Sequence, residues 1–446
     1  MRSTTLAQPI FAGIVAGVTG FASSFALLVA GLHNVGASDD QAASGLLVLC
    51  LVPGLITVAM SFLVKQPISM VWSTPGAALV LASSGIEDYR SAVTAFLLCG
   101  LLIVITGLWP WLARTVTRIP RPIASAMLAG ILFPICLAPV TATVQLPLLA
   151  LPIVLVWLVF FRLAPRWAVP AAVVVTIVVV AISSSGVDLS GARALPVLAP
   201  VVPGLNLGVV FGLGIPLYLV TMAGQNVPGF AVLRTFGYEH PPSRAIFLAT
   251  GAGNVLAAPF GGIALNLSAM TAAMVAGPDA HPDRDRRWVA AVAAGATLAA
   301  FGPLAGLAAV VVAASPPILI TAVAGLALLG ALISAITAAL EEPQNRIVAI
   351  VTFLVAVSGV SIAGIGSAFW ALLVGGIVML WLLPWRRRAA PMASAGERPG
   401  EPAVVEPAAG EPAGDAGGDA AGDPSGDSSG DSSGDESPSE NREPGV

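Results

Sequence analysis

Two short segments of the chain combine proline, glycine and small polar residues in a pattern that can bind an anion. They are residues 67–79 (PISMVWSTPGAAL) and residues 258–267 (APFGGIALNL). In each, an extended stretch with proline leads into a run too short to cross a membrane as a full helix. Unpaired N–H groups at the start of such a helix carry partial positive charge and attract anions. The pattern therefore indicates a ligand site made from backbone rather than from a charged side chain.

Proline and glycine have separate roles in these segments. Pro75 suits a first helical turn, because a missing N–H costs nothing there. Gly76, Gly261 and Gly262 allow a ligand to approach the backbone closely. The alternative is a pair of proline-kinked membrane helices that pack through small residues. Because two such segments occur at matching positions, the ligand site is the favoured interpretation.

Two adjacent amides form a further candidate group. Gln225 and Asn226 lie inside an apolar stretch, and the triplet 225–227 is similar to the triplet 33–35 earlier in the chain. Buried amides must pair with protein, water or substrate. Interhelical hydrogen bonding and substrate contact both remain open for this pair.

The composition shows which kind of protein must position these residues. The chain has 446 residues, of which 57% are hydrophobic and 10% charged. A soluble domain has about 25% charged residues. The single lysine, Lys65, also argues against nucleic-acid binding, which needs a basic surface. The composition therefore indicates a polytopic membrane protein.

Apolar stretches continue from about residue 9 to residue 385. At roughly 25–28 residues for a span and its loop, they accommodate about 14 spans. The predicted spans are 9–31, 40–63, 69–84, 91–113, 122–141, 144–162, 167–186, 205–233, 244–257, 262–277, 287–312, 317–339, 346–365 and 367–385.

The basic residues support this division. Of the eighteen in residues 1–388, sixteen fall in loops on one side, and only Arg90 and Arg193 fall on the other. This positive-inside pattern predicts a multi-pass protein of the inner (plasma) membrane with both termini cytoplasmic. The two short segments are the third and the tenth spans. They lie seven spans apart. Because an odd number of spans separates them, the two halves of the chain have opposite orientation in the membrane, which predicts a 7+7 inverted repeat.

The last residues have a different composition from the rest. Residues 389–446 hold thirteen acidic and two basic residues, a net charge of −11, while residues 1–388 carry +7. The segment has no aromatic residue and repeats short Gly/Asp/Ser units, so we expect a disordered cytoplasmic tail. An interaction tail and a merely solvated appendage both remain open.

Chemistry based on charged side chains is missing from the predicted spans. No Asp, Glu, Lys or Arg lies near the centre of any span, and Cys50, Cys99 and Cys136 read as small buried hydrophobes. No metal-ligand cluster, nucleophile–base pair or phosphate loop occurs, so we expect no enzyme, no metal and no cofactor. Asp39 and Asp40 lie between Ser38 and Gln41, which predicts a capping box at the second span.

Three stretches resemble the benzoate–proton symporter (BenE-like) family: residues 67–79, residues 221–234 and residues 258–283. The resemblance covers the membrane domain, 1–388, and excludes the tail. It implies a fold similar to nucleobase and sulfate-type transporters, with third and tenth segments built as half-helices preceded by extended strands. It also implies a core domain of spans 1–4 and 8–11 (about 9–113 and 205–312) and a gate domain of spans 5–7 and 12–14 (about 122–186 and 317–385).

By position, the resemblance places substrate between the two half-helices and the first and eighth spans. The implied substrate-binding residues are Phe21, Ser23, Ser24, Ser73, Thr74, Gly76, Gln225, Asn226, Phe260, Gly261, Gly262 and Asn266. Trp72 is a further candidate for the wall around the substrate ring. One position departs from the family pattern, because Ile263 stands where relatives often have a polar residue such as His.

The resemblance implies a secondary transporter that imports benzoate or a similar aromatic carboxylate with a proton, by alternating access. The proton carrier stays open between the substrate, water and His33, and a homodimer is also open. The alternatives are a transporter of another small anion or of a nucleobase on the same fold, and an anion channel. A membrane enzyme is disfavoured by the missing catalytic groups.

Overall fold

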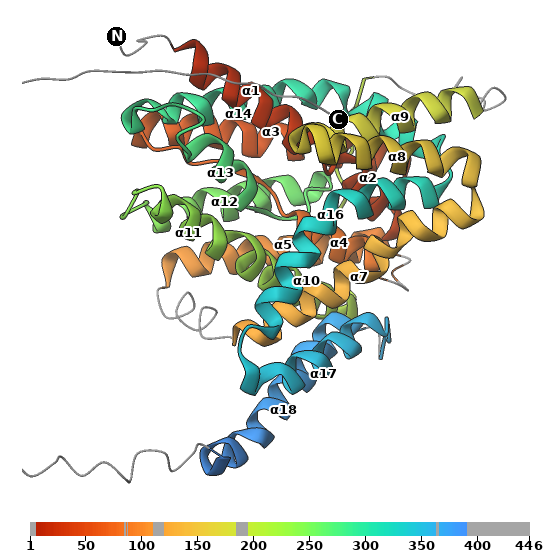
Figure 1. The fold of residues 1–446 in the computed structure, drawn as a ribbon, viewed down its shortest axis with the longest axis vertical. Helices are drawn as coiled ribbons and strands as arrows, with labels where there is room; N and C mark the ends of the chain where they lie inside the picture. The colour runs from red at the N-terminus through yellow and green to blue at the C-terminus, as the bar shows by residue number, and fades with distance from the viewer. Residues whose placement is uncertain are drawn as a thin grey trace, which may run out of the picture. The chain divides into compact units, whose positions relative to one another are not determined.

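The computed structural model describes residues 6–83, 86, 88–109, 120–183, 195–362 and 365–389, with the backbone alone for 383–389. Helices make up most of these residues, with two short strands among them (Figure 1). The predicted tail lies outside the described residues, apart from position 389. So do Arg2, Arg114, Arg118 and Arg193, which contribute to the predicted arginine pattern.

The first half of the chain contains one strand and the helices that surround it. Its elements are α1 (Ala7–Ala22), α2 (Phe25–Asn34), α3 (Asp39–Val64), β1 (Met70–Trp72), α4 (Thr74–Ala82), α5 (Tyr89–Leu108), α7 (Arg121–Gln145), α8 (Pro147–Leu163), the 3₁₀ turn η1 (Pro165–Trp167) and α9 (Ala168–Ser183).

The second half repeats this order and adds several short turns. Its elements are α10 (Leu207–Thr221), the π-helical turn η2 (Met222–Asn226), α11 (Val227–Thr235), α12 (Ser243–Ala257), η3 (Ala258–Phe260), β2 (Leu265–Leu267), α13 (Ala269–Ala276), η4 (Arg284–Arg286), α14 (Trp288–Phe301), η5 (Gly302–Leu304), α15 (Ala305–Ala313), α16 (Pro317–Leu340), η6 (Pro343–Asn345), α17 (Arg346–Val357) and α18 (Ser367–Ala389).

Each of the predicted segments coincides with a helix, a broken helix or a strand followed by a helix. Among the described residues, eight helical stretches are long and apolar enough to cross a membrane. Three further apolar helices are shorter: Pro147–Leu163, Pro343–Val357 and Ser367–Leu382. The number of fourteen crossings stays a prediction.

The first and eighth predicted spans are both broken near the middle. In the first, Ser23 and Ser24 separate α1 from α2, and both hydroxyls donate to the Gly20 carbonyl, at 2.9 and 3.1 Å. In the eighth, the π-turn Met222–Asn226 separates α10 from α11. Hydroxyls that bond to preceding carbonyls and π-turns both interrupt the regular helical ladder. The breaks fall at corresponding places in the two halves, as an inverted repeat requires.

The capping box predicted at the second span is confirmed. The Ser38 hydroxyl accepts from the Gln41 N–H at 3.3 Å, and the Gln41 side chain accepts from the Ser38 N–H at 2.9 Å. Two backbone N–H groups at the start of α3 thereby obtain acceptors. This fixes where the longest helix of the first half begins.

Small residues allow the helices to pack closely. A Cβ atom added to Gly54 of α3 would lie 2.7 Å from the Gly295 carbonyl oxygen of α14, and one added to Gly295 would lie 2.7 Å from that of Gly54. Close approach through small residues is the usual way in which membrane helices associate. α7 packs against α16 and α17, while α5 packs against α10 and α12. The division into core and gate domains stays a prediction.

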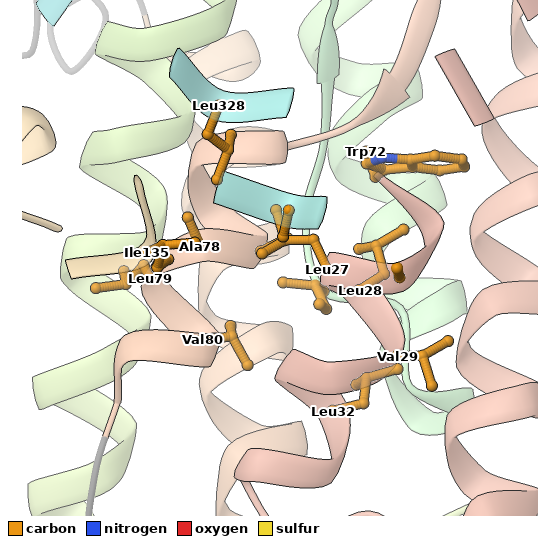
Figure 2. Close-up of a cluster of buried hydrophobic side chains, with 14 of the residues drawn as sticks. Leu27, Leu28, Val29, Leu32, Trp72, Ala78, Leu79, Val80, Ile135 and Leu328 are labelled. Carbon is orange, nitrogen blue, oxygen red and sulfur yellow. The ribbon is translucent and has the colours of Figure 1, made fainter. Parts of the chain in front are cut away.

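The largest buried cluster joins the short helix α4 to its neighbours. Figure 2 shows Leu28 and Leu32 of α2 with Ala78 and Val80 of α4, and Ile135 of α7 close to α4. A short helix makes few internal hydrogen bonds, so packing must supply most of its stability. This cluster therefore holds α4 at a defined place inside the bundle.

Candidate functional site

The two short strands pair with each other and thereby fix the positions of the two short helices that follow them. β1 and β2 are antiparallel, and Val71 lies opposite Asn266 at the centre of the register. The pairing continues past each strand, since the Ser73 N–H donates to the Ala264 carbonyl at 2.8 Å and the Ser268 N–H donates to the Ser69 carbonyl at 3.0 Å. These two bonds are related by the same approximate two-fold symmetry as the strands. The starts of α4 and α13 are thus fixed relative to each other.

Neighbouring helices satisfy the outer edges of this small sheet. Thr57 of α3 donates to the Met70 carbonyl at 2.9 Å and accepts from the Met70 N–H at 2.8 Å. On the other edge, the Asn226 amide oxygen accepts from the Leu267 N–H at 3.0 Å. An isolated two-stranded ribbon is marginal by itself, so these side chains stabilise it inside the bundle.

A serine caps each short helix in the same way. The Ser73 hydroxyl accepts from the Gly76 N–H at 3.0 Å, and the Ser268 hydroxyl accepts from the Thr271 N–H at 3.2 Å. Each cap satisfies one of the N–H groups that a helix start leaves without an intrahelical partner. Pro75 has no N–H to offer, and the Ala269 N–H donates to the Gln225 side chain at 3.3 Å.

One N–H group at each helix start remains without an acceptor in the described part of the chain. These are the N–H groups of Thr74 in α4 and Met270 in α13. α4 has nine residues and α13 has eight, so each is about 12–14 Å long. Because the capping residues Ser73 and Ser268 are buried, each helix starts inside the bundle and presents the positive end of its dipole there.

Thr74 and Met270 line the same cavity, which contains about 440 Å³ of space not filled by atoms, including space open to solvent. Its walls come from α1, the α1–α2 break, α3, the region of the strands, the start of α4, α13 and α14. The lining residues are Ala16, Gly17, Gly20, Ser23, Ser24, Thr57, Ser69, Met70, Val71, Trp72, Thr74, Ser268, Met270, Thr271, Ala294, Gly295 and Leu298. None of these described residues has an ionisable side chain.

Four of the residues singled out in the first half of the sequence meet at this cavity. Ser23, Ser24, Thr74 and Trp72 line it, and the Trp72 indole N–H donates to the Ser24 hydroxyl at 3.0 Å. Ser73 lies directly beside it as the cap of α4.

The other two first-half candidates do not line the cavity. Phe21 stacks between Phe25 and Phe301, with ring centroids 5.2 and 4.5 Å apart. A Cβ atom on Gly76 would lie 2.8 Å from Leu217, so this glycine permits close packing against α10.

The second-half candidates occupy positions around the cavity rather than in its wall. Gln225 and Asn226 brace the end of β2 and the start of α13 through their amide oxygens. Asn266 is fully buried in β2, where its amide nitrogen donates to the Leu267 carbonyl at 3.0 Å. These amides therefore make protein contacts, which was one of the two roles that the sequence left open.

Phe260, Gly261 and Gly262 precede β2 and are absent from the cavity wall. The Ser44 hydroxyl donates to the Phe260 carbonyl at 3.1 Å, and Gly261 has a φ of 96°. In the structure, the two glycines thus lie in a turn that precedes the strand and not at the start of the short helix. That start is Ser268, seven residues further along the chain than Gly261.

Sequence reasoning missed Ser268, Met270 and Thr271. A usable signal is present, because Ser268 and Thr271 have the same spacing as Ser73 and Gly76, with the serine as cap and the third residue after it as donor. Ser and Thr are common helix caps throughout proteins. Only the pairing of the strands distinguishes this serine from the others nearby.

Comparison with solved structures identifies the class of fold. The chain is similar to the transmembrane domain of the cyanobacterial bicarbonate transporter BicA, with a TM-score of 0.55 and 16% identity, covering 84% of this chain and 98% of that one. It is also similar to the murine Slc26a9 anion transporter in the inward-facing state, with a TM-score of 0.53 and 14% identity, covering 86% and 69%. The protein therefore has the fold of multi-pass, inverted-repeat membrane transporters.

Sequence comparison then identifies the family. The model of the benzoate membrane transport protein (BenE) family matches residues 3–381. The inner membrane protein YdcO of Escherichia coli is 36% identical over 392 residues, covering 87% of this chain and 100% of YdcO. The benzoate membrane transport protein of Acinetobacter baylyi is 30% identical over 376 residues, covering 83% and 94%. The chain belongs to the BenE family.

These findings confirm three expectations from the sequence. The suspected family is correct, the helical membrane-transporter fold class is correct, and the protein is a transporter and not an enzyme. It is a multi-pass membrane protein of a family of benzoate and anion-type transporters.

Proposed function

We propose that this protein is a secondary transporter that carries benzoate or a similar aromatic carboxylate into the cell together with a proton. The observation that carries the proposal is the pair of unpaired N–H groups, on Thr74 and Met270, whose residues line one cavity without ionisable side chains. Two helix starts that offer N–H groups to one cavity can bind an anion without a lysine or arginine. Membership of the BenE family supports benzoate as the anion.

In this proposal the carboxylate accepts hydrogen bonds from these N–H groups and from nearby hydroxyls. Thr74 and Thr271 have hydroxyls on residues that line the cavity, and the Thr271 hydroxyl accepts from Ser268, which leaves its own proton for a ligand. The ring lies against Trp72, Met270 and Leu298, which supply the apolar part of the wall. A mostly apolar cavity with a few placed polar groups is typical of small-molecule sites.

Transport requires the site to open alternately to each side. We propose that the half-helices and the helices around them move as a core against a gate that contains α7 and α16. The positive-inside pattern supports cytoplasmic termini, and inward transport follows from proton coupling. The proton travels on the substrate, on water or through His33, whose Nε2 lies 3.5 Å from the Asp39 carboxylate.

Uptake of radiolabelled benzoate into proteoliposomes tests the proposal. With an outside pH below the inside pH, we expect saturable accumulation against the benzoate gradient, which stops when the pH gradient is collapsed. Unlabelled small inorganic anions and nucleobases should compete poorly. Absence of benzoate uptake, or better competition by a nucleobase or another anion, contradicts the proposed substrate. Uptake that only equilibrates benzoate would indicate a channel.

A matched pair of glycine variants tests the position of the site. A Cβ atom on Gly20 has Thr271 Oγ1 as its nearest neighbour, at 3.9 Å, so a leucine there extends into the cavity without a backbone clash. Gly376 of α18 has no neighbour within 4 Å of its added Cβ atom and serves as the control. Gly20→Leu should abolish benzoate uptake while Gly376→Leu retains it. Normal uptake by folded Gly20→Leu places the substrate elsewhere.

A further inference from the structure

A second cavity continues along the same two helices that line the first. The first cavity is lined by Ala16 and Gly20 of α1 and by Met270 and Thr271 of α13. The second is lined by the preceding turns of α1 and the following turns of α13, and contains about 1030 Å³ of space not filled by atoms, open solvent included. The two cavities therefore follow one another along α1 and α13, and the second is the one nearer the start of α1.

The second cavity has polar groups on one part of its lining and an apolar wall on the rest. The Arg166 guanidinium lies 2.8 Å from the Asp279 carboxylate, and the Gln8 amide donates to the Asp279 carbonyl at 3.3 Å. Phe11 and Phe236 contribute aromatic rings to the lining. A cation beside aromatic surface is one combination that can bind an aromatic carboxylate.

The Arg166–Asp279 pair joins two parts of the chain that are distant in sequence. Arg166 belongs to the turn η1 between α8 and α9, while Asp279 follows α13. Both side chains are largely exposed, at 66% and 74%. An exposed ion pair contributes only about 0–1 kcal/mol, so another carboxylate can replace Asp279 at little cost.

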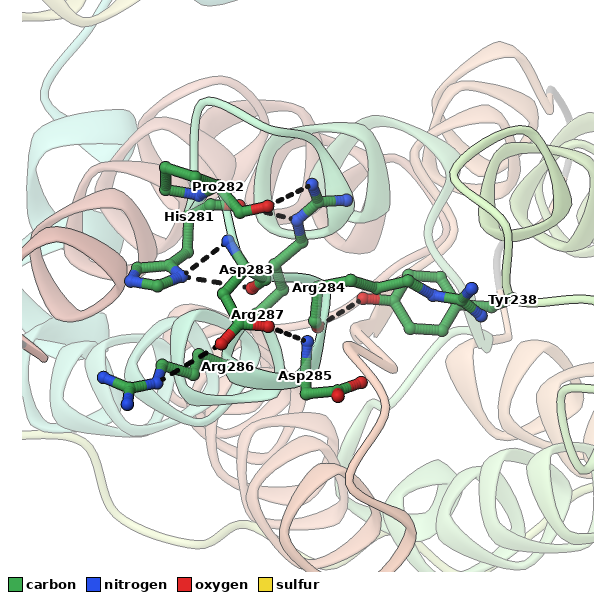
Figure 3. Close-up of polar contacts among 8 residues, drawn as sticks. All are labelled: Tyr238, His281, Pro282, Asp283, Arg284, Asp285, Arg286 and Arg287. Carbon is green, nitrogen blue, oxygen red and sulfur yellow. Dashed lines mark hydrogen bonds and ion pairs between the residues drawn. The ribbon is translucent and has the colours of Figure 1, made fainter. Parts of the chain in front are cut away.

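The loop that contains Asp279 is anchored firmly on its other side. Arg287 is 8% exposed and donates to the carbonyls of Ala276, His281 and Pro282, at 2.7 to 3.4 Å. Figure 3 shows Arg287 reaching back across this loop to His281 and Pro282. The backbone around Asp279 thus has a defined position, and opening of the ion pair does not require the loop to unfold.

We propose that the second cavity is a docking site for the aromatic carboxylate, and that Arg166 exchanges Asp279 for the substrate as it passes between solution and the half-helix site. The inference rests on the proposed function, since it uses the same substrate. The arginine pattern of the sequence predicts that these polar groups lie on the cytoplasmic side, where an imported substrate would leave. A guanidinium can bind a carboxylate through two parallel hydrogen bonds. In the exchange, Arg166 is paired with one carboxylate before and after, first that of Asp279 and then that of the substrate.

The alternative is that the ion pair only holds two helices together. Arg166→Gln and Asp279→Asn each remove the pair, so a purely structural pair predicts the same effect for both. Docking predicts different effects, because Arg166→Gln removes the receptor for the substrate, whereas Asp279→Asn removes only the group that competes with the substrate. Arg162→Gln is the control, since Arg162 is exposed, lies four residues earlier and does not line the cavity.

The experiment measures benzoate transport in right-side-out and inside-out membrane vesicles that contain the full chain. At the cytoplasmic face, Arg166→Gln should raise the KM for benzoate about five- to tenfold, the loss expected for one exposed charge-assisted contact. Asp279→Asn should lower that KM or leave it unchanged, and Arg162→Gln should match the wild type. At the opposite face, KM should be unchanged in all variants.

An equal rise of KM in both pair variants overturns the docking role, and so does an unchanged KM in Arg166→Gln. Transport by the wild type in the same vesicles reports on the proposed function separately. If the wild type moves no benzoate, both proposals fail; if it does and the two variants behave alike, only the docking site fails.

Discussion

The hydroxyl of Ser73 makes two buried hydrogen bonds, so its removal should have a measurable and separable cost. It caps α4 through the Gly76 N–H at 3.0 Å and accepts from the Thr221 hydroxyl of α10 at 2.9 Å. Ser73 and Thr221 are 1% and 0% exposed. A serine cap contributes about 1 kcal/mol. A hydrogen bond between membrane helices contributes about 0.6 kcal/mol.

We therefore expect Ser73→Ala to lower the free energy of unfolding by about 1.6 kcal/mol, a change of about 15-fold in the unfolding equilibrium. Thr221→Val should cost about 0.6 kcal/mol, because valine keeps the shape and removes only the donor. The double variant should cost no more than Ser73→Ala alone, since the Thr221 hydroxyl has already lost its acceptor. The coupling energy is then about 0.6 kcal/mol.

Equilibrium unfolding in mixed micelles, with sodium dodecyl sulfate as denaturant, measures these differences. Thr352→Val is the control partner, because Thr352 is equally buried but bonds to the Val348 carbonyl within its own helix α17. Its cost should add to that of Ser73→Ala without coupling. The reasoning is refuted if Thr221→Val and Ser73→Ala are additive, or if the Thr352 control couples as strongly.

Three further predictions concern the backbone and packing, and the same unfolding assay tests them. Gly261→Ala should lower the free energy of unfolding more than Gly359→Ala does. Both glycines have positive φ, at 96° and 64°, which costs an alanine about 1–2 kcal/mol, but only at Gly261 would the new Cβ atom clash, 2.8 Å from the Tyr89 hydroxyl. Equal losses in the two variants would contradict the clash. Gly295→Ala should lower stability by about 1–3 kcal/mol by separating α3 from α14, and an unchanged stability would show that these helices can shift. Arg287→Met should cost about 3 kcal/mol or more and expose its loop to proteases, because three carbonyls lose a charged donor; protease resistance equal to the wild type would contradict this.

Local features of the fold could be predicted well from the sequence. The capping box of Ser38 and Gln41 needs only residues three positions apart, and it is present. The start of α4 was also predictable, because Pro75 and the small residues around it have a local conformational preference. The arginine pattern and the apolar runs placed every predicted segment on a helix or a strand–helix element.

The start of the second short helix could not be found in this way. Gly261 and Gly262 resemble a flexible approach to a helix, but the register of β2 against β1 moves the helix start to Ser268. That register depends on residues almost two hundred positions apart, such as Val71 and Asn266. Local propensity contains no information on such a pairing.

The roles of the amides were undecided for a related reason. A buried glutamine or asparagine must find a partner, but its sequence position does not say which one. In the structure, the oxygens of Gln225 and Asn226 accept from the Ala269 and Leu267 N–H groups. Gln225 thus satisfies a donor at the start of α13, Asn226 satisfies one at the end of β2, and the Met270 N–H remains for a ligand.

The N–H groups that remain unpaired at the two helix starts distinguish between a carboxylate and a nucleobase as the substrate. With Pro75 lacking an N–H, and with Gly76, Ala269 and Thr271 already paired, each short helix offers one N–H, from Thr74 and from Met270. Both are donors, and the cavity wall has no ionisable side chain. A nucleobase presents donors as well as acceptors on its edge, and its donors cannot pair with these two N–H groups and would need the hydroxyls of the wall as acceptors. A carboxylate presents acceptors alone and meets both donors. The hydrogen-bonding capacity of the backbone at the two helix starts therefore favours an anion over a nucleobase.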